Sequence, residues 1–180
     1  DENPQLAAFY NLNGESYSNS AQLLFEISAA KWVDVRLAYR YNDVKTTFGE
    51  QLLRKPLASP QRAFANFEFK LGKGWSIDYT INWLDKVRIP STASNPLRYR
   101  WDEYSPKYFL SNAQISKSYK NGFEWYVGGE NIFDYKLHEP IIASNDPFGP
   151  YFDGSLAWGP IMGVNVYAGV RYSLKSGEKE

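Results

Sequence analysis

Seven segments of the chain alternate apolar and polar side chains residue by residue. The last segment shows the pattern most clearly, because every second residue from Val164 to Leu174 is apolar or aromatic. Such alternation is typical of a β-strand with one apolar face and one polar face. The pattern predicts an all-β fold with strands near residues 20–30, 32–46, 61–72, 75–88, 107–119, 122–134 and 163–174.

Short and long connections alternate between these segments. Tight hairpin turns are predicted at 30–31, 72–74 and 120–122, where Gly or Asn supports the turns at the last two. Irregular stretches at 48–60, 88–107 and 135–162 hold most of the prolines. In an up-and-down antiparallel sheet, this order places every short turn on one rim and every long loop on the other. Residues 1–19 could add part of another strand.

The apolar face could meet either a protein core or the hydrocarbon of a membrane. A water-soluble antiparallel sheet produces the same alternation, so a β-sandwich or a lipocalin-like binding module remains an alternative. The predicted strands of about ten residues are long enough to cross a bilayer at a tilt, whereas soluble strands average about five or six residues. The asymmetry of the two rims is also that of outer-membrane barrels. Both features favour the membrane.

Aromatic residues support the same choice, with 6 Trp, 14 Tyr and 11 Phe among 180 residues. Trp75 and Trp83 are separated by about 26 Å along a strand, or about 20 Å of height at the usual tilt. Two interfacial girdles are predicted, one with Trp32, Trp75, Tyr119 and Phe123, the other with Tyr39, Tyr41 and Trp83. We therefore expect an antiparallel up-and-down transmembrane β-barrel segment of about seven to eight strands, open or incomplete, because such bacterial barrels have even strand numbers.

Composition argues against several other classes. Twenty basic and twenty acidic residues balance, so no large field draws the chain to nucleic acid. There is no cysteine, and the sole histidine, His138, is expected to have a surface role beside Glu139. No catalytic motif is present, so neither an enzyme nor a cofactor is predicted. The first residues lack a signal peptide pattern, so an export signal is expected outside this sequence.

The region from Gly128 to Leu174 resembles the end of the TonB-dependent outer-membrane receptors, particularly forms common in Bacteroidetes-like bacteria. An ENxFD-type motif closes the penultimate strand, and a WGP stretch leads into the final strand. The last strand also resembles the assembly signal that the barrel-insertion machinery reads. The residues that match these three features are Glu130, Asn131, Phe133 and Asp134; Trp158, Gly159 and Pro160; and Gly169, Tyr172 and Leu174.

The resemblance implies that residues 1–180 are the C-terminal portion of a 22-stranded barrel, without the plug domain. It implies a place in the outer membrane, with the C-terminus in the periplasm. The partners would be outer-membrane lipid, the N-terminal barrel and plug of the same receptor, TonB acting through the plug, and the insertion machinery. The cargo would be a scarce nutrient, such as a ferric siderophore, another metal chelate such as haem or cobalamin, or an oligosaccharide.

One loop is the best candidate for ligand contact. Arginine and aromatic side chains together recognise anionic, ring-bearing molecules, and this loop holds Arg98, Tyr99, Arg100, Trp101 and Tyr104. The alternative is that these side chains pack loops against one another. For the whole chain, the alternative to a receptor fragment is a stand-alone small outer-membrane barrel with an adhesive or structural role.

Overall fold

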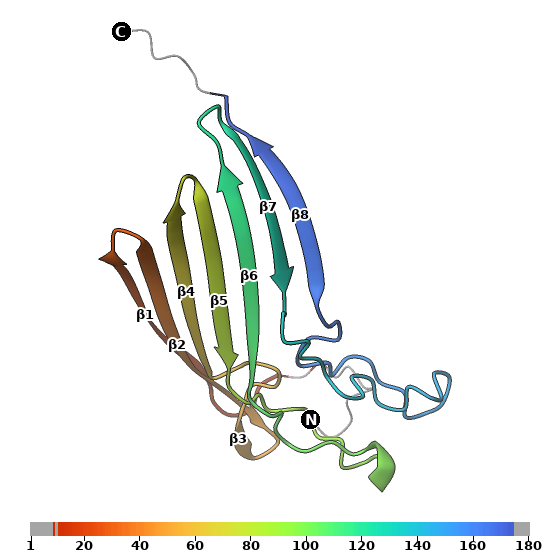
Figure 1. The fold of residues 1–180 in the computed structure, drawn as a ribbon. Coiled ribbons are helices and arrows are strands. Elements are labelled where there is room, and N and C mark those ends of the chain that lie inside the picture. The colour runs from red at the N-terminus through yellow and green to blue at the C-terminus, as the bar shows by residue number, and fades with distance from the viewer. Residues whose placement is uncertain (1–8, 10, 175–180) are drawn as a thin grey trace.

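The strands form one antiparallel up-and-down sheet in the computed structural model, which describes residues 9 and 11–174 (Figure 1). This confirms the predicted all-β architecture. The described residues include one 3-10 helix, η1 (Leu97–Tyr99), and none of their helices is long and apolar enough to cross a membrane. The strands are β1 (Ser16–Ala30), β2 (Val33–Phe48), β3 (Gln51–Arg54), β4 (Gln61–Gly72), β5 (Trp75–Leu84), β6 (Tyr108–Ser118), β7 (Phe123–Glu130) and β8 (Asn165–Tyr172).

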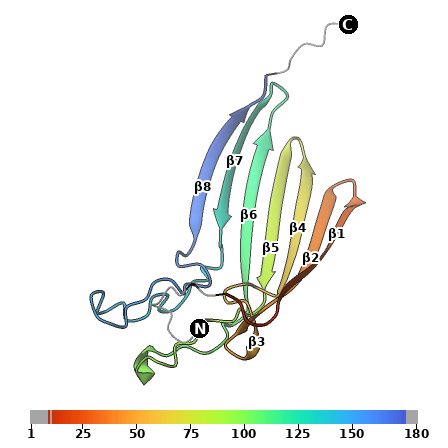
Figure 2. The same ribbon diagram turned by 180° about the vertical axis from the view of Figure 1, so that it is seen from behind.

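The sheet is open rather than closed into a barrel. Its order is β1-β2-β4-β5-β6-β7-β8, and β3 pairs only with β2. Figures 1 and 2 show the short turns and the end of β8 on one rim, and the long loops on the opposite rim. The predicted separation of turns and loops is therefore confirmed.

Several strand ends differ from the prediction. Stretch 48–60 is not wholly irregular, because Gly49 turns the chain with φ 60° and β3 pairs back on β2. The first strand starts at Ser16, since the elongated β2 offers it further partners. The fourth predicted strand stops at Leu84, and the sixth stops at Glu130 because Asn131 adopts a positive φ of 50°.

The register collects the apolar residues on one face of the sheet. Residues that are direct partners on neighbouring strands share a face. One such row crosses six strands and consists of Val33, Phe69, Ile77, Ile115, Val127 and Ala168. The alternating segments of the sequence thus produce a continuous apolar surface.

No described helix or second sheet covers this apolar face. On β8, Val166, Val170 and Tyr172 are 71%, 70% and 63% exposed. Among the described residues, six of the eight buried hydrophobic side chains belong to the long loops, namely Val87, Ile89, Leu137, Ile142, Ala143 and Leu156. The sheet is a single layer, and its apolar face is not a protein core.

The opposite face carries charges that pair across neighbouring strands. Glu26 and Arg36 are 3.1 Å apart, and Glu124 lies 3.2 Å from Arg171. Lys70 forms a further ion pair with Asp34. These pairs are largely exposed, so each contributes little to stability. They form a solvated polar wall on this face of the sheet.

A reciprocal arrangement of tyrosines and glycines joins β7 to β8 on the polar face. Tyr126 is the direct partner of Gly169, and Gly128 is the direct partner of Tyr167. A Cβ atom at either glycine would overlap the ring of the facing tyrosine. The two rings meet edge to face with centroids 6.3 Å apart, and Tyr167 donates a hydrogen bond to Gln114 at 3.1 Å. Each glycine therefore provides the space that one ring occupies.

We predict that Gly169→Val lowers the free energy of unfolding by about 1–3 kcal/mol, because the added methyl groups must displace the Tyr126 ring. In a Tyr126→Ala background the same change should be neutral or stabilising, since valine favours strands. Ala168→Val, on the opposite face of β8, is the matched control. Urea unfolding in detergent micelles measures the wild type and all four variants. An equal cost of Gly169→Val in both backgrounds would contradict the ring–glycine contact.

Candidate functional site

The long loops form a compact unit with a small hydrophobic core. Ile89 from the loop after β5 packs with Ile142, Ala143 and Leu156 from the loop after β7. Three aromatic side chains, Tyr99, Trp101 and Trp158, lie against this core. The two loops, which are distant in sequence, are therefore held together at one rim of the sheet.

A hollow of about 270 Å³ opens between these two loops. The side chains in its lining that can bind a ligand are Arg100, Trp101, Asp102, Tyr104, His138, Glu139 and Trp158. Arg100, Asp102, His138 and Glu139 are exposed, so the hollow is accessible to solvent. Three residues of the predicted ligand loop thus meet the His138–Glu139 pair, whereas Arg98 and Tyr99 lie outside the lining. Asp102 and Trp158 complete the site but carry no recognisable sequence signal for it.

Loop contacts hold the predicted ligand residues in place. Arg100 donates to the Asn95 carbonyl at 2.7 Å through Nε, and the Trp101 amide donates to Thr92 Oγ1 at 2.8 Å. Outside the hollow, Arg98 lies 4.4 Å from the centroid of Tyr99, whose ring packs against Tyr151 at 5.9 Å. Tyr99 therefore joins the two loops, and Arg98 packs on Tyr99 within its own loop. Ligand contact by Arg100, Trp101 and Tyr104 stays a prediction.

Arg88 connects this unit to the β2–β3 hairpin. Its Nε donates to the Arg54 carbonyl at 2.6 Å, and its guanidinium lies 5.0 Å from the centroid of the Phe48 ring. The backbone of Arg88 also forms an isolated β-bridge with Tyr104, beside the hollow. Burial lowers the pKa of the Arg88 guanidinium, although Tyr104 and Glu103 oppose that shift. All three long loops are thereby linked.

The ENxFD motif forms a clasp where β7 ends. The Asn131 side chain donates to the carbonyls of Tyr135 at 2.6 Å and Met162 at 3.3 Å, and accepts from the Tyr135 amide at 3.0 Å. Asp134 accepts from the Val164 amide at 3.2 Å, so the motif holds both ends of the loop together. Glu130 accepts from Asn165 at 3.3 Å, while Phe133 is exposed.

The WGP motif anchors the same loop to the polar face of the sheet. Tyr108, at the start of β6, stacks on Tyr135 with ring centroids 4.8 Å apart and contacts Trp158 at 5.7 Å. A Cβ atom at Gly159 would lie 3.3 Å from Leu137 Cδ2 and 3.4 Å from the Tyr108 ring, so the chain passes close to both side chains. Leu137 donates its amide to the Pro160 carbonyl at 2.9 Å. The aromatic stack on Tyr108 is not evident from the sequence.

The predicted girdle residues form two aromatic groups on the sheet. Near the short turns, Trp32 stacks on Phe69 at 6.3 Å, Trp75 contacts Trp125 at 5.4 Å and Tyr119 contacts Phe123 at 5.9 Å. Lys117 lies over Trp75, 5.1 Å from the ring centroid, a contact that the alternating pattern of the sequence does not indicate. Toward the loop rim, Tyr39 and Trp83 flank Ala63 in one row and Tyr41 lies in the next. Their interfacial role stays a prediction.

Comparison of the chain with protein-family models, with curated proteins and with solved structures gives no match. Within residues 9 and 11–174, no three His, Cys, Asp or Glu side chains are grouped so that they could hold a metal ion. The lining of the hollow offers hydrogen-bond donors and acceptors, charged groups and aromatic ring faces.

We predict that Asn131→Ala lowers the free energy of unfolding by about 1–3 kcal/mol, because the part-buried backbone groups of the clasp lose their partners. The released loop 131–164 should also be cleaved faster by trypsin, which can be followed by gel electrophoresis and mass spectrometry. Asn145→Ala, at an exposed position of the same loop, is the control and should change neither quantity. Equal cleavage rates for both variants would show that Asn131 does not fasten the loop.

Proposed function

We propose that this chain is part of the barrel wall and outer loops of a TonB-dependent outer-membrane receptor that imports a scarce nutrient. The observation that carries the proposal is the single-layer antiparallel sheet whose apolar face has no protein cover. In water such a surface would be strongly unfavourable, because large contiguous apolar patches are rare on soluble proteins. The hydrocarbon of a membrane would cover the face and keep it from water. The alternation of apolar and polar residues is that of barrel strands, in which lipid-facing and lumen-facing residues alternate.

The two alternatives explain this observation less well. A soluble sandwich or lipocalin-like module needs a second layer or a closed sheet over the apolar face, and no described residue supplies one. A stand-alone barrel is disfavoured by the relative direction of the two edge strands. Six antiparallel steps separate β1 from β8, so these edge strands run the same way and could close only as a parallel pair. Additional strands from the rest of the same receptor would close it antiparallel.

The parts of the chain then have separate tasks in transport. The apolar face contacts outer-membrane lipid, and the polar face lines the lumen around the plug. The long loops lie outside the cell, and β8 ends toward the periplasm, where TonB acts through the plug. The insertion machinery would read Gly169, Tyr172 and Leu174. Of these, Tyr172 shares the apolar face with Phe123, whose partner it is.

The loop hollow is the proposed place of ligand contact. Trp101, Tyr104 and Trp158 offer ring faces, while Arg100, Asp102 and Glu139 offer donors and acceptors. The two carboxylates offset the arginine, so the hollow favours a ligand with both donors and acceptors over a purely anionic one. This proposal assigns binding and transport to the chain, and no catalysis.

Single-cysteine substitution tests the membrane part of the proposal, because the chain itself has no cysteine. Val166→Cys and Val170→Cys should give blue-shifted emission with an environment-sensitive thiol fluorophore after reconstitution into lipid vesicles. Asn165→Cys and Arg171→Cys on the same strand should give water-like emission, because they face the lumen. Water-like emission at all four positions would reject the lipid-facing assignment.

Uptake assays test the receptor part. Disruption of the gene should abolish uptake of one nutrient from a panel of labelled ferric siderophore, haem, cobalamin and oligosaccharide. A protonophore should abolish the same uptake in wild-type cells, because TonB draws on the proton gradient. Arg100→Ala with Trp101→Ala should weaken uptake, while Asn145→Ala serves as the loop control. Unchanged uptake of the whole panel in the disrupted strain would argue against an import receptor.

A further inference from the structure

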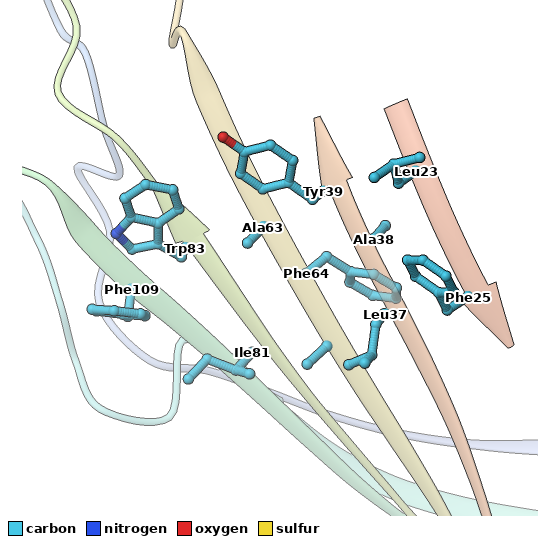
Figure 3. Close-up of a pocket in the computed structure, with 11 residues that line it drawn as sticks. Leu23, Phe25, Leu37, Ala38, Tyr39, Ala63, Phe64, Ile81, Trp83 and Phe109 are labelled. Atoms are coloured by element: carbon cyan, nitrogen blue, oxygen red, sulfur yellow. The ribbon is translucent and has the colours of Figure 1, made fainter. Parts of the chain in front are cut away.

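A groove of about 400 Å³ lies on the apolar face of the sheet near the loop rim (Figure 3). It is distinct from the loop hollow and shares none of its residues. Nine of its eleven lining residues belong to the apolar face, and Ala38 and Phe64 alternate with them along β2 and β4. The nine are Leu23, Phe25, Leu37, Tyr39, Ala63, Ala65, Ile81, Trp83 and Phe109.

The groove arises from two small side chains between rows of large ones. Ala63 and Ala65 on β4 form its floor. In one row Ala63 has Tyr39 and Trp83 as its partners, and in the next Ala65 has Leu37 and Ile81. The walls on β2 and β5 are two strand spacings apart, or about 10 Å. After their side chains fill part of that width, the remaining space suits one extended hydrocarbon chain lying along β4.

The groove has a polar end toward the loop rim. The Tyr39 hydroxyl donates to Gln61 Oε1 at 2.6 Å, which places polar groups immediately above the apolar floor. Further along β2 on the same face lie Asp43 and Lys45, and Arg54 on β3 is the direct partner of Lys45. The Lys45 ammonium lies 3.9 Å from Oδ1 of Asp43, which is two residues nearer the groove along β2, and 5.9 Å from the centroid of the Tyr17 ring on β1.

We propose that this groove holds one acyl chain of an anionic lipid whose phosphate lies at Lys45 and Arg54. The proposal rests on the membrane location proposed above. Charge complementarity selects the lipid class, because two cations and one carboxylate leave a net charge of +1 beside the polar end of the groove. A phosphate diester would neutralise it. The apolar floor and the phosphate site together distinguish a specific lipid from general contact with hydrocarbon.

The test uses the indole of Trp83, which lines the groove. The protein, purified in detergent, is reconstituted into phosphatidylcholine vesicles that contain either brominated phosphatidylglycerol or brominated phosphatidylcholine as a minor component. Bromine quenches nearby tryptophan, and subtraction of the Trp83→Phe emission isolates the Trp83 signal. Each basic residue near a headgroup enriches anionic lipid about five-fold. Brominated phosphatidylglycerol should therefore quench Trp83 at several-fold lower mole fraction than brominated phosphatidylcholine.

Two pairs of variants separate the groove from its charges. Ala63→Leu with Ala65→Leu fills the floor and should abolish the preference, while Ala113→Leu, on the same face outside the lining, should retain it. Lys45→Gln with Arg54→Gln should also abolish the preference, whereas Lys31→Gln with Lys73→Gln, at the opposite rim, should not. Retention of the preference in the filled variant would overturn the proposal.

Other outcomes identify which proposal is wrong. Equal quenching of Trp83 by both lipids would show general hydrocarbon contact and no lipid site. Trp83 shielded from both lipids, with quenching restored as the protein is diluted in lipid, would assign the groove to a second copy of the chain. If no tryptophan of the protein is quenched by either lipid, the membrane location itself is wrong.

Discussion

The structure depends on one physical constraint: the apolar face of its sheet must be removed from water, and no described part of the chain covers it. Protein domains usually cover such a face with a second packed layer. Here six strands supply a continuous apolar row, yet Val166 and Val170 remain about 70% exposed. Each buried large aliphatic side chain contributes roughly 1.5–3 kcal/mol to folding. A sheet without that contribution needs apolar surroundings, and this need is the physical basis of the receptor proposal.

Protein packing is concentrated where the sheet ends. Ile89, Ile142 and Leu156 form a core only in the loops, beyond the reach of any hydrocarbon layer that covers the strands. Tyr108 connects the loops to the sheet, because it belongs to β6 and its ring stacks on Tyr135 in the loop after β7. Burial raises the pKa of the Tyr135 hydroxyl. The loop unit therefore has a small protein core of its own, whereas the apolar face of the sheet has none among the described residues, and this arrangement suits the ligand site that we propose.

The sequence predicts the sheet well and the loop site poorly, for a physical reason. Strand pairing obeys a period of two residues, so the positions of Ile77 and Val127 on one face follow from the alternation alone. The hollow depends on contacts between loops that are distant in sequence, such as Trp101 near Trp158. No local period encodes these contacts. The two motifs are intermediate between the sheet and the hollow. Asn131 and Gly159 are recognisable in the sequence, but the hydrogen bonds of Asn131 and the close approach of Gly159 to Tyr108 are evident only in the structure.

The two free edges explain why the reciprocal tyrosine–glycine contacts lie where they do. An unpaired strand edge costs several kcal/mol per backbone group in hydrocarbon, and both β1 and β8 present such edges. Within the described residues β8 forms backbone pairs with β7 alone, and the side-chain hydrogen bond from Tyr167 to Gln114 reaches β6. Tyr126 over Gly169 and Tyr167 over Gly128 fix the register of this pair from the polar side, and they leave the apolar side of the pair uncovered. A last strand held in one register presents a defined edge, which is what closure with a further strand requires.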